Sequence, residues 1–181
     1  MAANTSEKRI AVALETLANS IGGCLGKRLS TDPSTYNTAA QDPNFVLGGL
    51  YRYTTNGWIY RYVQFLDAVT YAAGQSVEYA ATTGTKVTND RAGGSSVGRA
   101  AAGVVLGVMT QNYYGFILVN GFATLATSGA DDIAAGEIVI THATTDGTVD
   151  GVSTWTLGCL GVALDADDNT ANTVNAAVMC M

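Results

Sequence analysis

The side chains that most often carry out chemistry are few in this chain. His142 is the single histidine, and no cysteine or acidic residue stands beside it in the sequence. Neither the G-x-S-x-G motif of serine hydrolases nor a cysteine in a catalytic context is present, so a Ser–His–Asp arrangement has no local support. We therefore expect His142 to lie on the surface and the protein not to be an enzyme.

Ligands for a metal or a phosphate are also poorly arranged. The acidic run at 165–169 lacks the Gly and the Glu that a calcium loop needs at its sixth and twelfth positions. Glycine-rich segments lack the phosphate-binding G-x-x-x-x-G-K pattern. Three cysteines without a C-x-x-C spacing indicate reduced thiols, and these are Cys24, Cys159 and Cys180. The sequence predicts no metal site and no cofactor.

Length and composition indicate one folded domain. The chain has 181 residues, of which 48% are hydrophobic and 13% charged, which is too apolar for a disordered chain. The net charge of −6 repels phosphate, so a nucleic acid bound through general electrostatic attraction is excluded as a partner. Apolar runs stay far below the roughly 18 residues of a membrane-spanning helix, so we expect no membrane partner either.

Charge divides the chain into two halves. All nine Lys and Arg lie between residues 8 and 99, whereas residues 100–181 are acidic or neutral. Surface helices normally carry both signs of charge, so a long stretch without Lys or Arg that is rich in Thr, Gly and Val favours strands and turns. The sequence therefore predicts a mainly β fold, closed as an antiparallel β-barrel or β-sandwich that limits exposed edges.

The N-terminal segment has a different character. Ile10, Leu14, Leu17 and Ile21 follow the spacing of one helical stripe, which predicts a short amphipathic helix. From residue 27 to 43 the chain turns polar, with Asp-Pro turn signals at 32–33 and 42–43, and we expect an extended arm. Residues 1–44 thus form a helix and arm, and residues 45–181 form the β-domain.

A hairpin is predicted around Asn56 and Gly57, because this residue pair tolerates the positive φ of a two-residue type I′ turn. The expected cross-strand pairs are Tyr53–Tyr60, Tyr51–Tyr62 and Arg52–Arg61. The ribbon would have an aromatic face and a cationic face.

We expect negatively charged groups near the cationic face, because like charges placed opposite each other destabilise a sheet by a fraction of a kcal/mol. Arg52 and Arg61 would be answered by carboxylates of the same chain, such as Asp67 or Glu78, or by an acidic patch on another protein. The aromatic face has two interpretations as well. Its residues form a core or subunit interface, or a sugar-binding surface, and they are Tyr51, Tyr53, Trp58, Tyr60 and Tyr62.

One pattern occurs twice in the chain. Ala-Ala-Gly, a polar residue and a Val-containing run stand at 72–77 and again at 134–139, and Leu-Gly-Val follows at 106–108 and at 160–162. A Gly turn that feeds a strand, and a strand with a Gly bend, suit such a unit. Two related β-halves are one explanation of the repeat, and chance is the other.

The segments AAGEIV at 134–139 and CLGVALDA at 159–166 resemble those of the decoration, or cement, proteins of tailed-bacteriophage heads. The resemblance extends over residues 71–181. It implies a β-barrel or β-tulip-like domain, made in the host cytoplasm, that assembles as a homotrimer on the outer capsid surface of the virion. There it would clamp neighbouring major capsid proteins and stabilise the shell.

On this interpretation the protein is structural, and it acts by binding rather than by chemistry. The residues expected to contact the capsid or a neighbouring protomer are cationic or apolar: Lys8, Arg9, Ile10, Leu14, Leu17, Lys27, Arg28, Arg52 and Arg61. A second hypothesis is a carbohydrate-binding or host-adhesion module of a virion, such as a head fibre or tail component. In that case Trp58 and Tyr60 would stack on a sugar.

Overall fold

The computed structural model describes residues 27–66, 70–80, 85–90, 100–129, 132–156, 158–167 and 172–180. The helix predicted over residues 10–21 lies outside these ranges. The same holds for several residues singled out in the sequence: Lys8, Arg9, Ile10, Leu14, Leu17, Cys24 and Asp67.

Strands dominate the described residues, which confirms a mainly β fold. They are β1 (Lys27–Leu29), β2 (Asn37–Thr38), β3 (Leu50–Tyr53), β4 (Ile59–Phe65), β5 (Ser76–Tyr79), β6 (Lys86–Thr88), β7 (Ala101–Val105), β8 (Tyr114–Ala126), β9 (Ile138–Thr141), β10 (Val149–Val152), β11 (Cys159–Ala163) and β12 (Thr173–Met179). A short 3-10 helix, η2, spans Pro33–Thr35. Within the described ranges, no helix has the length and hydropathy to cross a membrane.

The sheet is mixed, so the expectation of a purely antiparallel sheet is wrong. The strand order is β1-β3-β4-β6-β5-β7-β8-β12-β11-β9-β10, with β2 paired to β8. Strands β1 and β3 run parallel, and so do β4 and β6. In both cases the partners are separated along the chain by another strand, so the second partner returns in the direction of the first. Alternation and turn signals do not reveal such non-consecutive pairing.

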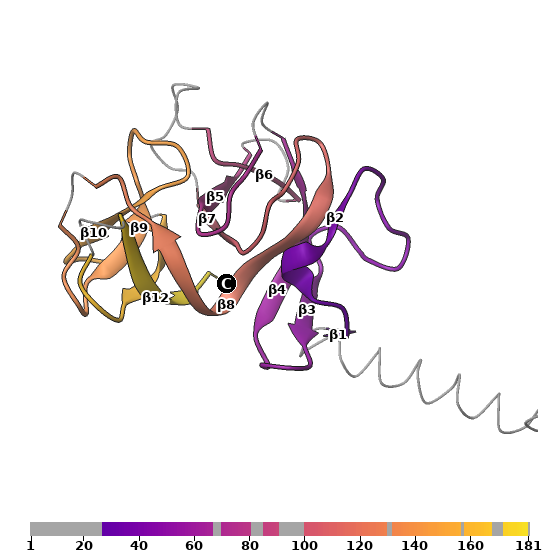
Figure 1. The fold of residues 1–181 in the computed structure, drawn as a ribbon, viewed down its shortest axis with the longest axis horizontal. Coiled ribbons are helices and arrows are strands. Elements are labelled where there is room, and N and C mark those ends of the chain that lie inside the picture. Colours follow the sequence, from indigo (N-terminus) through magenta and orange to yellow (C-terminus); the bar gives the residue numbers. More distant parts are fainter. Residues whose placement is uncertain are drawn as a thin grey trace, which may run out of the picture.

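The strands form two units that share β8. In the first unit, β4 pairs with β6, β6 with β5, β5 with β7, β7 with β8, and β8 again with β4, so the pairing closes on itself. In the second unit, the far half of β8 pairs with β12, followed by β11, β9 and β10. A parallel bridge between Thr127 and Val149 joins β10 back to the end of β8. Figure 1 shows β8 as a long curved strand that passes from β4 to β12.

The two units repeat one pairing scheme residue by residue, as expected of two related β-halves. Each unit contains the same register irregularity in the pair that joins β5 to β7 or β9 to β11. Equivalent pairs are Tyr60–Leu118 with Phe122–Ala177, Val77–Gly103 with Val139–Gly161, Tyr79–Val87 with Thr141–Val149, and the parallel pairs Phe65–Val87 with Thr127–Val149.

The repeated Ala-Ala-Gly turn explains why this part of the duplication is visible in the sequence. Gly74 and Gly136 have φ of 86° and 87°, a conformation that glycine adopts without a steric penalty. In each turn the polar residue after the glycine accepts a hydrogen bond from the first alanine. These bonds run from Ala72 N–H to Gln75 Oε1 (3.0 Å) and from Ala134 N–H to Glu137 Oε2 (2.8 Å).

The predicted equivalence of the two Leu-Gly-Val strings is wrong. The expected equivalent of 160–162 was Leu-Gly-Val at 106–108, but the registers align residues 160–162 with 102–104, whose sequence is Ala-Gly-Val. Residues 106–108 lie after the end of β7. The identity of the two strings is therefore not a structural equivalence, whereas Gly103 and Gly161 occupy the same position in the two units.

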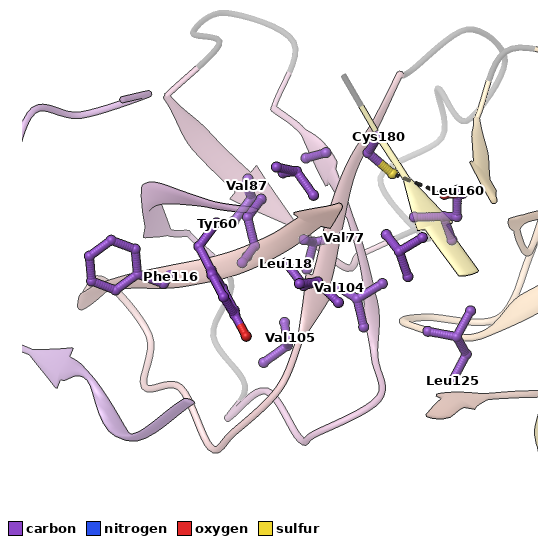
Figure 2. Packing of buried hydrophobic residues seen from close by; sticks show 14 of the residues in the cluster. Tyr60, Val77, Val87, Val104, Val105, Phe116, Leu118, Leu125, Leu160 and Cys180 are labelled. Carbon is purple, nitrogen blue, oxygen red and sulfur yellow. Dashed lines mark hydrogen bonds between the residues drawn. The ribbon is translucent and has the colours of Figure 1, made fainter. Parts of the chain in front are cut away.

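A continuous apolar core runs through both units. Buried residues of the first unit include Val104 and Leu118, and those of the second include Leu125 and Leu160 (Figure 2). The thiol of Cys180 donates a hydrogen bond to the carbonyl of Leu160 at 3.5 Å. Polar contacts join the units as well, because Thr141 Oγ1 donates to Glu78 Oε1 at 2.6 Å.

Residues 29–53, which we call the cover segment, lie over the outer side of the first unit. The ring of Phe45 lies 5.0 Å from that of Phe116 and 5.3 Å from that of Tyr62. Backbone N–H groups of the cover segment donate to tyrosine hydroxyls, from Val46 to Tyr51 (2.7 Å) and from Asp42 to Tyr62 (3.1 Å). The described part of the predicted arm therefore packs on the β-domain, and β2 adds to it by pairing with β8.

Candidate functional site

The predicted hairpin exists, but its register differs by two residues from the expected one. Tyr53 N–H donates to the carbonyl of Trp58, and Gly57 N–H donates to the carbonyl of Tyr53, both at 2.9 Å. The loop therefore has four residues, 54–57, with Gly57 at a φ of 74°. Asn56 Oδ1 accepts from Trp58 N–H at 3.0 Å, a local side-chain bond that favours the longer loop.

This register corrects the predicted arginine pair. Arg52 lies opposite Ile59, and Arg61 lies opposite Leu50, so the two arginines are not directly opposed. A shift of two residues keeps each side chain on its face of the ribbon, because side chains alternate along a strand. Arg52 and Arg61 therefore still share one face of the ribbon.

The residue that pairs with Arg52 on the neighbouring strand is Arg28, and the sequence did not predict this pairing. Strand β1 pairs in parallel with β3 and places Arg28 opposite Arg52 in the register. Both arginines are exposed. We call Arg28, Arg52 and Arg61 the arginine face, because cross-strand partners in a sheet point to the same side. Lys27 is exposed on β1 but pairs with Tyr51, so it belongs to the opposite side of the sheet.

Charge on the arginine face is not balanced within the described ranges, where neither Arg28 nor Arg52 forms a salt bridge with a described carboxylate. Arg61 is half-buried, its guanidinium carbon lies 5.5 Å from the ring centroid of Tyr79, and its buried Nε makes no hydrogen bond. Burial raises the pKa of the nearby Cys180 thiol to about 12, although the positive charge of Arg61 opposes this. The face can accept an anionic partner.

The predicted aromatic residues divide into buried and half-buried groups. Tyr51, Tyr60 and Tyr62 are at most 3% exposed and belong to the core, so these three rings cannot stack on a sugar. Tyr53 and Trp58 are half-buried. Trp58 packs at the junction of the units, where its ring lies 6.2 Å from that of Phe122 on β8.

The remaining candidates for chemistry have structural roles. His142 Nδ1 accepts hydrogen bonds from the N–H groups of Thr144 (3.1 Å) and Thr145 (2.9 Å) and thereby holds a turn. Asp165 accepts two hydrogen bonds from Asn175, which lower the pKa of this carboxyl group. In the part of the chain that the structure describes, no three side chains of His, Cys, Asp or Glu gather as metal ligands.

Comparisons with known proteins give little further information. No family model and no curated protein matches the chain. Among solved structures, the chain is similar to the crystal structure of the head fiber gp8.5 N base in bacteriophage phi29, with a TM-score of 0.45 and 11% sequence identity. The match covers 66% of this chain and 92% of that chain. A similarity at this level supports no conclusion about function.

Proposed function

We propose that this protein is a structural protein of a phage virion that decorates the outer capsid surface as a homotrimer and clamps neighbouring major capsid proteins. The observation that carries the proposal is the arginine face, on which two exposed arginines stand side by side without a described carboxylate partner. The resemblance of residues 71–181 to capsid decoration proteins supports it. We also propose the β-tulip-like architecture that this resemblance implies.

The physical argument for a charged partner comes from the cost of the arginine pair. Like charges opposed across two strands destabilise the sheet, and a partner that supplies carboxylates converts this cost into attraction. The net charge of −6 makes general attraction to nucleic acid unfavourable. An acidic protein surface is therefore the partner that the arginine face fits, and no catalytic group or cofactor is required for this role.

The experiment adds the purified full-length protein to capsid shells that lack it, and measures co-sedimentation and the melting temperature of the shell. We expect saturable binding that raises this temperature. Arg52→Glu should weaken binding by about tenfold or more, since it places a like charge against the acidic surface. Lys86→Glu makes the same charge change on β6 and should bind as the parent protein does.

A well-folded protein that does not bind any shell would contradict the proposal. Loss of binding that is equal for Arg52→Glu and Lys86→Glu would show that net charge, and not the arginine face, controls the interaction.

A further inference from the structure

The duplication makes it possible to compare equivalent outer faces of the two units. In the first unit this face carries Tyr60, Tyr62, Phe116 and Leu118, and each of these is at most 3% exposed. Their equivalents in the second unit are Phe122, Thr124, Asn175 and Ala177, as the registers of β8 with β4 and with β12 show. In the second unit Phe122 is 55% exposed. The same surface is covered in one unit and open in the other.

The cover segment accounts for this difference. It supplies Tyr53, whose ring lies 6.4 Å from that of Tyr60, the equivalent of Phe122. It also supplies Tyr36 and Phe45, whose rings lie 5.4 Å and 5.0 Å from that of Phe116. The cover segment precedes the first unit in the chain. The first strand of the second unit is the far half of β8, so the residues directly before it already belong to β8. Among the described residues, the second unit therefore has no segment of its own in the corresponding place.

The open face is apolar in its centre. Around Phe122 lie Met179 and Leu164, which are 43% and 54% exposed, and the half-buried Val162, which pairs with Ala177. We call this surface the open face. Several exposed apolar side chains on one face of a sheet are typical of surfaces that bind another chain.

The polar groups of the open face already bind one another. Thr124 Oγ1 donates to Asn175 Oδ1 at 2.7 Å, and Asn175 donates from its backbone and side chain to Asp165 at 2.8 Å and 2.6 Å. An apolar group can therefore cover Phe122 without leaving these polar groups unsatisfied. Residues 100–181 contain no Lys or Arg, so Asp165 favours an occupant that brings positive charge.

We propose that the open face of one copy binds the N-terminal segment of a second copy, with Ile10, Leu14 and Leu17 packed around Phe122. These residues follow a helical stripe in the sequence, and Lys8 and Arg9 beside them complement Asp165. The inference rests on the homotrimer of the proposed function, and it names the surfaces through which the copies would meet.

Chain length and strand order are consistent with exchange between copies. Twenty-six residues precede Lys27, enough to reach roughly 85 Å when extended or about 40 Å as a helix. Strand β1 stands at the end of the strand order away from the second unit, and Figure 1 places β1 and β12 on opposite sides of β4. A contact between two different surfaces closes into a ring when the rotation permits, and three copies would give the proposed homotrimer.

The test measures the mass of the free full-length protein by sedimentation equilibrium. The arm variant is Leu14→Asp with Leu17→Asp, and the face variants are Phe122→Asp and, separately, Met179→Asp. The control is Val108→Asp, which places the same charge on a residue that is 63% exposed in the first unit. We expect the parent and the control to assemble, and the arm and face variants to associate about tenfold or more weakly. Circular dichroism and the melting temperature establish that each variant is folded, and the two face variants guard against misfolding of one of them.

Mixing the variants identifies the two surfaces that meet. The arm variant keeps an intact open face, and Phe122→Asp keeps an intact arm, so an equimolar mixture should form heterodimers and grow no further. A Phe122→Asp protein that remains assembled would show that the arms bind each other, and an arm variant that remains assembled would show that the faces do. Either result, or a monomeric parent protein, overturns the inference.

This measurement is made without shells, so its outcome can be told apart from that of the shell-binding experiment. Assembly as described without shell binding would leave the inference standing and remove the cement role. Shell binding by a protein whose assembly does not depend on the open face would support the cement role and overturn the inference.

Discussion

Gly103 and Gly161 occupy the same position in the two units, and each lies opposite a valine at the point where the register shifts. Gly103 pairs with Val77 and Gly161 with Val139. The residue after each of these glycines then pairs with the next strand of its unit, which is β8 in the first unit and β12 in the second. Two copies of one backbone device, a bulge with close strand approach, therefore set the shape of both units.

Replacing either glycine by alanine should severely destabilise the protein. A Cβ atom at Gly103 would overlap the carbonyl oxygen of Leu118, and one at Gly161 would overlap that of Ala177. Both obstacles are backbone atoms of paired strands, which cannot move aside without breaking strand pairing. We expect each variant to lose about 3 kcal/mol or more of unfolding free energy, measured by urea denaturation.

The matched control is Gly136→Ala. A Cβ atom at this turn position meets nothing within 4 Å, and only the φ of +87° is unfavourable, so the expected cost is about 1–2 kcal/mol. If Gly103→Ala or Gly161→Ala cost no more than Gly136→Ala, close approach would not be the reason for these glycines.

The turn that carries the polar residue gives a second prediction. Glu137→Gln should leave the unfolding free energy unchanged within about 0.5 kcal/mol, because Gln75 makes the equivalent hydrogen bond in the first unit. Glu137→Ala removes the acceptor for Ala134 N–H and should cost roughly 0.5–1.5 kcal/mol. Thermal melts of the two variants beside the parent test this difference, and equal melting temperatures for both variants would disprove the role of the side chain.

The sequence predicted local features well because local residues determine them. The Ala-Ala-Gly turn, the hairpin at Asn56 and the mainly β character each depend on a few neighbouring residues. The loop length was missed, because one side-chain hydrogen bond from Asn56 decides between two and four loop residues. The sharing of β8 between two units was also missed, since pairing between distant strands leaves no signal in a short window.

The candidate site followed the same rule. The alternation of side chains along the strands predicts Arg52 and Arg61 on one face, and this remains correct in the observed register. The neighbour Arg28 comes from a parallel pairing that the sequence did not suggest. The open face around Phe122 could have been found from the sequence only with the repeat aligned correctly, because Phe122 then corresponds to the buried Tyr60.

Alkaline pH should destabilise the protein through its buried tyrosines. Burial raises the pKa of Tyr60 to about 12, and it also raises the pKa of Tyr51 and Tyr62. In the unfolded chain tyrosine titrates near pH 10, so the unfolded state loses protons first. The stability is complete below about pH 10 and is lost as the pH rises toward 12.

The melting temperature between pH 9 and 11.5, recorded together with tyrosinate absorbance, measures this effect. Tyr60→Phe removes one titrating hydroxyl and should make the decline with pH shallower. A melting temperature that stays constant up to pH 11.5 would contradict the burial of these hydroxyls.

The arginine pair gives a prediction in which stability and binding move in opposite directions. Arg28 and Arg52 stand side by side on parallel strands, so removing one charge relieves repulsion in the free protein. Arg28→Ala should raise the unfolding free energy by a few tenths of a kcal/mol, and more at low salt than at high salt, because exposed charges are screened. The same variant should bind capsid shells more weakly.

Replacing a residue that binds a partner, and does not stabilise the fold, should raise stability and weaken binding. Lys27→Ala is the control on the same strand, since Lys27 lies opposite Tyr51 and no cation faces it in the register. It should show no salt-dependent gain in stability. If Arg28→Ala destabilised the protein at low and high salt alike, packing of the arginine stem would outweigh its charge, and the argument from unbalanced charge to an acidic partner would fail.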